Sequence, residues 1–234
     1  MSTAPQPAVS ASRGVVYNLA GQLLPALAAL VAVPILARGI SGEAFGVVAF
    51  AWASLGYFSL VDLGMGRALT QAVAAHVHRD VHLVAELAWT CWTVLLTFGA
   101  TLSGVVALYT LFEPAWLEPL LGSLPAARRA WWLLLAGLPC VVLSSGFRGM
   151  LEGLHRFDIV NLVRVPAAIG SYALPAALAL RTERVDVLVA SIVAVRLATC
   201  GVYGAACLRV LLPHASGACR PGAHGACSPA WAPG

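Results

Sequence analysis

The chain has 234 residues, of which 60% are hydrophobic and only 10% are charged, and its formal net charge is +4. Its mean hydropathy is +0.85, whereas ordinary soluble domains contain about 25% charged residues. This composition excludes a soluble globular domain built around one hydrophobic core, and it predicts a protein that crosses a membrane several times.

Six apolar runs of helical length follow one another along the chain. A helix needs about 20 apolar residues to cross a hydrocarbon core of roughly 30 Å. Lipid offers the backbone no hydrogen bonds, and the runs lack the alternation of barrel strands, so we expect helices. We therefore predict an all-α polytopic membrane helix bundle with about six transmembrane helices. The runs cover residues 15–37, 44–61, 87–112, 130–147, 159–180 and 186–208.

The sequence divides into three segments. Residues 1–14 form a predicted cytoplasmic tail, and residues 15–212 form the transmembrane lobe, whose first run is longer than the apolar core of a signal peptide. After Leu212 the composition shifts to Gly, Ala and Pro without helical periodicity. We expect residues 213–234 to be disordered.

Prolines interrupt two of the runs at equal spacing, Pro25 and Pro34 in the first and Pro166 and Pro175 in the fifth. Each proline removes one hydrogen bond between a residue and the residue four positions earlier. Such interruptions occur in transporters at substrate or gating elements, and they are also common in transmembrane helices generally. Both a functional role and plain packing remain open.

Two pairs of glycines have GxxxG spacing, Gly42 with Gly46 and Gly149 with Gly153. This spacing allows two membrane helices to approach closely. With 22 glycines in the chain, chance matches are also expected.

Residues 62–86 are the most patterned polar stretch. Apolar side chains recur there every three or four residues, which predicts an amphipathic helix at the cytoplasmic interface or an extension of a transmembrane helix. These residues are Leu69, Val73, Val77, Val81 and Val84.

The same stretch places His78, His82 and Glu86 four residues apart on one helical face. A metal site or a proton-responsive site is one interpretation. Interfacial histidines that face water are the preferred one, because no fourth ligand is evident.

The six cysteines form no CxxC pair, and three or four of them lie in apolar runs, where a thiol behaves as a small hydrophobic group. We predict no disulfide framework and no zinc ribbon. In the tail, Cys219 and Cys227 with His214 and His224 match no common metal site. The sequence therefore predicts no metal and no cofactor.

The arginines set the predicted orientation through the positive-inside rule. With the N-terminus inside, seven arginines lie on the cytoplasmic side and five lie outside, which favours this topology weakly. The seven are Arg13, Arg67, Arg79, Arg148, Arg156, Arg209 and Arg220, and the five are Arg38, Arg128, Arg129, Arg181 and Arg184.

Two further arginines lie inside apolar runs, Arg164 in the fifth and Arg196 near the middle of the sixth. A charge at the centre of a bilayer costs from about 3 to above 10 kcal/mol, so it usually faces the bundle interior or a water-filled cavity. Arg164 is only five residues into its run and could instead reach the interface. The two arginines indicate a membrane protein that handles something polar or anionic.

Three blocks of sequence resemble the oligosaccharide flippases of the multidrug/oligosaccharidyl-lipid/polysaccharide exporter superfamily. The blocks are NLAGQLLPALAALVAVPILARGISGEAFG at 18–46, GYFSLVDLGMGRALTQAVAAH at 56–76 and FRGMLEGLHRFDIVNLVRVP at 147–166. Together with the spans between them they cover about residues 12–210. Members of this family typically have twelve or fourteen helices in two lobes around a central cavity, so six helices would correspond to the N-terminal lobe.

The resemblance implies transport of a polyprenyl-pyrophosphate-linked oligosaccharide across a bacterial inner membrane by alternating access between two lobes. No catalytic motif is found, so an enzyme is not expected. The partners implied are the lipid bilayer, the lipid-linked oligosaccharide and a second lobe or a homodimer, with no nucleic acid.

Guanidinium groups bind pyrophosphate oxygens in bidentate geometry. We therefore assign two groups of site residues as expectations. The substrate contacts are Arg196, Arg164 and Asn161, and the residues around the cytoplasmic gate are Asp62, Arg67, Arg148 and Glu152.

Two other functions remain open. The chain could be a small-molecule or drug antiporter of the same superfamily that is coupled to a cation gradient. It could also be a non-transporting membrane scaffold or a decayed fragment, because one lobe cannot enclose a cavity by itself.

Overall fold

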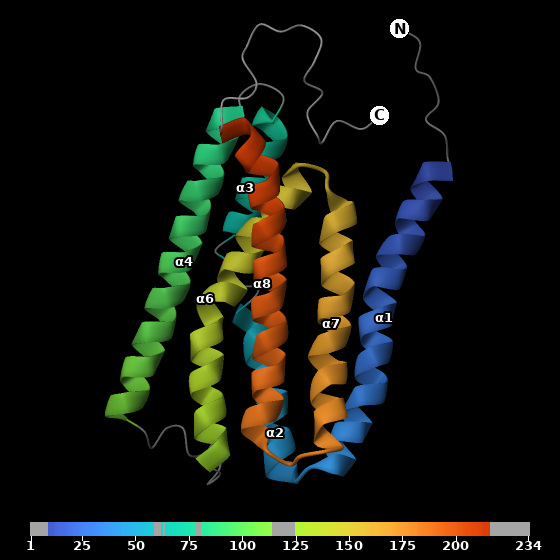
Figure 1. The fold of residues 1–234 in the computed structure, drawn as a ribbon, viewed down its shortest axis with the longest axis vertical. Helices are drawn as coiled ribbons and strands as arrows, with labels where there is room; N and C mark the ends of the chain where they lie inside the picture. Colours follow the sequence, from blue (N-terminus) through green and yellow to red (C-terminus); the bar gives the residue numbers. More distant parts are fainter. Residues whose placement is uncertain (1–8, 59–61, 63, 78–80, 114–124, 216–234) are drawn as a thin grey trace, which may run out of the picture.

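The computed structural model describes residues 9–58, 62, 64–77, 81–113 and 125–215 (Figure 1). Every regular element in these ranges is a helix, which confirms the predicted all-α class. The helices are α1 Val9–Gly39, α2 Gly42–Phe58, α3 Met65–His76, α4 Val81–Phe112, α6 Pro125–Gly153, α7 Phe157–Ala179 and α8 Val185–Ala215.

Each predicted apolar run overlaps one of six of these helices, with ends that differ by several residues, and the last three residues of the run 44–61 lie outside the described part. Among the described residues, four helices are long and apolar enough to cross a membrane, namely α4, α6, α7 and α8, and α1 contributes a shorter apolar stretch over Leu23–Gly39. A multi-pass bundle is therefore confirmed, whereas length and composition alone do not establish six spans. α1 begins at Val9, inside the predicted tail, and residues 1–8 and 216–234 lie outside the described part.

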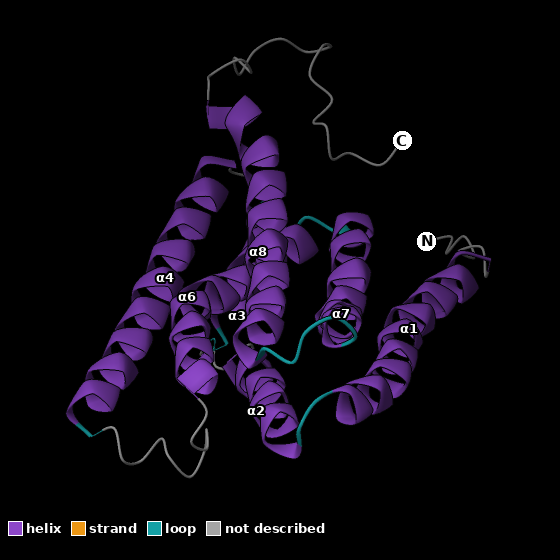
Figure 2. Ribbon diagram, turned by 60° about the horizontal axis from the view of Figure 1, so that its bottom comes forward, coloured by secondary structure: helices purple, strands orange, loops and turns teal. Residues whose placement is uncertain are grey.

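The long helices lie side by side in one layer, and α6 and α8 form its centre (Figure 1). α1 packs on α7, α7 on α8, and α4 on α6. Short loops join α1 to α2 and α7 to α8 at the same end of the bundle (Figure 2). Two helices far apart in sequence, α1 and α7, therefore become neighbours.

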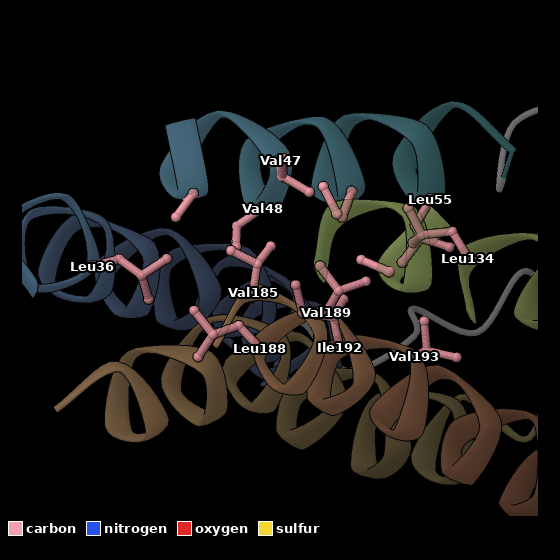
Figure 3. Close-up of a cluster of buried hydrophobic side chains, with 14 of the residues drawn as sticks. Leu36, Val47, Val48, Leu55, Leu134, Val185, Leu188, Val189, Ile192 and Val193 are labelled. Carbon is pink, nitrogen blue, oxygen red and sulfur yellow. The ribbon is translucent and has the colours of Figure 1, made fainter. Parts of the chain in front are cut away.

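Two hydrophobic clusters hold the bundle together, and each occupies one end. The first joins α1, α2 and α7 to the first halves of α6 and α8, and Leu36, Val48 and Ile192 lie fully buried in it (Figure 3). The second joins α3 and α4 to the second halves of α6 and α8 through residues such as Val73 and Cys207. Both clusters depend on α6 and α8, so these two helices carry the core.

α2 and α3 together behave as one interrupted helix. They contain 17 and 12 residues, which together equal the 29 residues of α6. Phe50 of α2 contacts Trp131 near the start of α6, with ring centroids 6.0 Å apart, whereas Thr70 of α3 hydrogen-bonds to Gly149 near its end. α3 therefore extends the line of α2 along α6. The stretch 62–86, for which the sequence predicts one helix, is instead divided between α3, which ends at His76, and α4, which begins at Val81.

The interruption is capped by Asp62. Its carboxylate accepts hydrogen bonds from the backbone N–H of Gly64 at 3.0 Å and of Gly66 at 3.3 Å, so it satisfies free donors at the start of α3. Gly64 has a φ of 72°, in the left-handed region that favours glycine. The DLGMG sequence thus restarts the helix and keeps a carboxylate at the break.

One of the two GxxxG pairs forms a helix contact. A side chain at Gly149 would collide with the backbone of Gly66, and one at Gly153 would meet the Thr70 oxygen at 2.8 Å. Neither Gly42 nor Gly46 has an atom within 4 Å of the position of an added Cβ. This contact explains why α6 continues to Gly153, past the predicted end at residue 147, because α3 packs against the added turns.

Two prolines free backbone carbonyls that neighbouring helices then use. Pro175 has no N–H to give to Ser171, and the Ser171 carbonyl instead accepts the indole N–H of Trp52 at 3.0 Å. Pro139 likewise frees the Leu135 carbonyl, which accepts the Ser103 hydroxyl at 2.7 Å. At both prolines the freed carbonyl is satisfied within the protein, as a membrane interior requires.

At the end of the bundle opposite α3, Asp186 joins α6 to α8. Its carboxylate accepts hydrogen bonds from Arg129 at 3.1 Å and from Arg184 at 3.0 Å, and its side chain is only 11% exposed. Both arginines lie among the five that the sequence assigns to the outer side. A charge pair therefore closes this end of the two central helices.

Because α3 and α6 are in close contact, one methyl group added at Gly149 should strongly lower the stability of the bundle. Replacing Gly149→Ala forces two backbones apart and should lower the free energy of unfolding by about 1–3 kcal/mol. The control, Gly46→Ala, adds the same methyl group to open space and should leave stability unchanged or raise it by up to about 1 kcal/mol. Thermal unfolding in detergent, followed by tryptophan fluorescence, measures both, and equal stability of the two variants would contradict the close contact.

The Trp52 hydrogen bond predicts a coupling with Pro175. Trp52→Phe should cost about 1 kcal/mol in the wild-type chain, because the Ser171 carbonyl loses its donor. In a Pro175→Ala background the cost should be smaller, since the restored backbone N–H at position 175 can bond to that carbonyl. A double-mutant cycle on unfolding midpoints measures the coupling. Trp132→Phe, at an exposed tryptophan of α6, is the control, and an identical cost of Trp52→Phe in both backgrounds would refute this account.

Candidate anion-binding site

A cavity of about 310 Å³ opens between α6, α7 and α8, and α1 borders it through Pro25. We call it the arginine cavity, because Arg148, Arg164 and Arg196 all line it. The sequence placed two of these residues in apolar runs and the third at a gate, so their convergence is a result of the fold. The other polar residues in the lining are Ser144, Ser145, Ser171, Tyr172, Thr199 and Tyr203.

Arg196 is the deepest of the three arginines. It lies eleven residues after the start of α8 at Val185, which is about 17 Å along a helix that rises 1.5 Å per residue. Its Nε atom is buried and has no hydrogen-bond partner in the described part of the chain. A buried guanidinium donor without a partner is costly, and it is the kind of group that a ligand satisfies.

Arg164 and Arg148 complete the positive lining. Arg164 lies on α7 one turn beyond Val160, whose carbonyl accepts the Tyr203 hydroxyl at 3.1 Å, and this bond fixes α7 against α8 beside the cavity. Arg148 belongs to the extended end of α6. Among the described lining residues there is no carboxylate. The cavity therefore concentrates positive charge.

Three hydroxyl groups in the lining are already satisfied. Ser144, Ser171 and Thr199 each donate to the backbone carbonyl four residues earlier, at 2.7 to 2.8 Å. The hydroxyls of Ser145 and Tyr203 also donate to backbone carbonyls. The guanidinium groups and the Tyr172 hydroxyl are therefore the donors that remain for a ligand. A cavity with this pattern favours an anion over a neutral molecule.

A second cavity, of about 450 Å³, lies where α3 meets α6. We call it the gate cavity, because all four predicted gate residues, Asp62, Arg67, Arg148 and Glu152, line it. Within it, Arg148 Nε lies 3.5 Å from a carboxylate oxygen of Glu152. Ser145 and Arg148 line both cavities, so the two cavities share a wall.

Asn161 lies on α7 three residues before Arg164, but it is half-buried and is not among the described residues that line the arginine cavity. Its predicted substrate contact therefore has no support from the position of the side chain. The role of Asn161 stays a prediction.

The predicted histidine face lies only partly within the described residues. His82 and Glu86 are exposed on α4, and His78 lies outside the described part, as do Cys219 and Cys227 of the tail. Among the residues that the structure describes, no group of three His, Cys, Asp or Glu side chains could hold a metal ion. The water-facing interpretation fits the exposure of the two described side chains.

Helical spacing carries information about the lining that the sequence analysis did not use. Ser144 and Arg148 lie four residues apart on α6, Arg164 and Ser171 lie seven apart on α7, and Thr199 follows Arg196 by three. Each helix thus has one polar face. A search for such faces on every apolar run would have found the cavity side of α6 and α7.

The comparisons with known proteins agree with this architecture. The sequence profile described as "Polysaccharide biosynthesis protein" matches residues 11–222. A protein of Shigella flexneri named "Putative O-antigen transporter" is 29% identical over 148 residues, which are 63% of this chain and 35% of that protein. The chain thus covers only about a third of the curated relative that it matches. No solved structure matches. Because the profile covers most of the chain, this bundle of apolar helices belongs to the polysaccharide biosynthesis protein family.

Proposed function

We propose that this chain is part of a transporter that moves a lipid-linked oligosaccharide across the bacterial inner membrane for the export of a surface polysaccharide. The family membership and the name of the Shigella flexneri relative support an export function. The arginine cavity supports the finer proposal that the transported lipid carries a pyrophosphate. In this proposal the N-terminus is cytoplasmic and the gate cavity opens on the cytoplasmic side.

The observation that carries the proposal is the set of three arginines around one cavity whose described lining contains no carboxylate. Each guanidinium presents a planar fork of donors that matches phosphate oxygens. In a region of low dielectric constant, such charge-assisted hydrogen bonds are about twice as strong as neutral ones. The buried Nε of Arg196 gives the anion at least one donor that the protein leaves free.

Transport of this kind makes and breaks no covalent bond in the substrate. The chain supplies one bundle of helices, and Arg164 is exposed at the side of the arginine cavity. We infer that a second helical lobe or a second copy of the chain covers this side and that the two halves alternate between inward-open and outward-open arrangements. Asp62 and Arg67, beside the interrupted helix, act as a latch in this cycle.

Binding of a prenyl pyrophosphate tests the proposal directly. The purified chain in detergent should bind farnesyl pyrophosphate more tightly than farnesol, which has the same chain without the anion. Arg196→Gln should raise the Kd for farnesyl pyrophosphate by about 10- to 100-fold, because a hydrogen bond to a charged group contributes about 1.5–3 kcal/mol. Microscale thermophoresis measures the Kd.

The matched control is Arg209→Gln, which removes an exposed arginine from the same helix outside both cavities. It should leave the Kd within about twofold. If both variants bind equally well, or if farnesol binds as tightly as farnesyl pyrophosphate, the anion site is wrong.

The same substitution tests the export function in cells. Arg196→Gln introduced at the chromosomal locus should reduce surface polysaccharide to near the level of a strain that lacks the gene, as measured on gels of extracted polysaccharide. Arg209→Gln should leave it near the wild-type level. Undiminished polysaccharide with Arg196→Gln, at equal amounts of membrane protein, would remove Arg196 from the transport site.

A further inference from the structure

Arg148 faces two different environments. It lines the gate cavity, where its Nε lies 3.5 Å from Glu152, and it also lines the arginine cavity, where no described carboxylate is present. The two residues are four apart on α6, so helix geometry holds their side chains close together. Arg148 therefore has a carboxylate partner in the gate cavity and borders a second cavity whose described lining has no carboxylate.

The Arg148–Glu152 pair is weak enough to exchange. The two side chains are 42% and 34% exposed, and pairs with this exposure and spacing contribute little, because water screens them. By contrast, Asp62 is held by two backbone N–H groups at the start of α3. Of the two carboxylates in the gate cavity, Glu152 is the one that a competing anion could displace from its arginine.

Glu152 also lies close enough to act on the arginine cavity. Its carboxylate lies 3.5 Å from the Nε atom of Arg148, and Arg148 lines this cavity. The negative charge of Glu152 thus opposes the positive charge of Arg148 at the wall that the two cavities share. An anion in the arginine cavity meets both repulsion from Glu152 and competition for Arg148.

We propose that Glu152 is an internal competitor that sets the affinity of the arginine cavity for a pyrophosphate. This inference rests on the proposed function. Without ligand, Glu152 holds Arg148 toward the gate cavity. When a pyrophosphate enters the arginine cavity, Arg148 turns to it, and when Glu152 takes Arg148 back, the anion is left with two arginines and leaves more easily.

The competition has a purpose in a transporter. Three arginines that close on one pyrophosphate without opposition would hold it for a long time, because affinity differences appear mainly in the dissociation rate. A carboxylate one helical turn away supplies a substitute partner for Arg148, so release does not leave the charge of this arginine uncompensated. Glu152 in this role lowers affinity and raises turnover.

Removal of the competing charge tests the proposal. Glu152→Gln should lower the Kd for farnesyl pyrophosphate by roughly two- to tenfold and should lower the dissociation rate by a similar factor, since the lost pair is a partly exposed one. A merely structural role of Glu152 predicts the opposite, because a loosened site binds more weakly. In an Arg148→Gln background, Glu152→Gln should change log Kd by less than about half of the change that it causes in the wild-type chain. Stopped-flow and equilibrium binding in detergent supply these values.

Asp158→Asn is the matched control, because it removes an exposed carboxylate from a pair with Arg156 outside both cavities. It should leave the Kd and the dissociation rate unchanged within about twofold. The proposal is overturned if Glu152→Gln weakens binding or leaves it unchanged while the wild-type chain binds farnesyl pyrophosphate. If the wild-type chain itself does not bind this probe, the proposed function fails and the inference fails with it.

Discussion

The contact between Gly66 of α3 and Gly149 of α6 brings the polar groups of the gate cavity together. No side chain separates the two backbones there, and Thr70 adds hydrogen bonds to the carbonyls of both glycines at 2.9 and 3.0 Å. This close approach brings the break between α2 and α3 to the side of α6. Asp62, at that break, and Glu152, at the end of α6, consequently line one cavity.

Two further features of the fold reflect the need to satisfy polar backbone groups inside the protein. Because Pro175 has no N–H, the carbonyl of Ser171 would lack a hydrogen-bond donor, and the indole N–H of Trp52 from α2 donates to it instead. At the break after α2 the first N–H groups of α3 would lack acceptors, and the Asp62 carboxylate accepts hydrogen bonds from two N–H groups there. A neighbouring helix thus supplies the missing partner at Pro175, and the residue two positions before Gly64 supplies it at the break.

The two cavities differ in how their charges are balanced. In the gate cavity two carboxylates accompany two arginines, whereas the described lining of the arginine cavity carries three arginines and no acid. Arg148 belongs to both, so any movement of this side chain shifts positive charge from one to the other. This arrangement suits the proposed passage of an anionic headgroup. A headgroup that leaves the arginine cavity meets the gate cavity, where carboxylates partly neutralise the arginines, so that the anion is bound less strongly there.

The sequence by itself determined the class of the protein, the approximate position of its helices and the family, because hydropathy and motif order are properties of neighbouring residues. It also identified Arg164 and Arg196, since a charge in an apolar run is evident without a structure. The tertiary structure decided that Arg148 joins them, that Asn161 does not line the cavity, and that α3 continues α2 along α6. These features depend on contacts between residues far apart in the chain, such as Trp52 with Ser171, which are 119 residues apart, and no local pattern specifies which helix faces will meet.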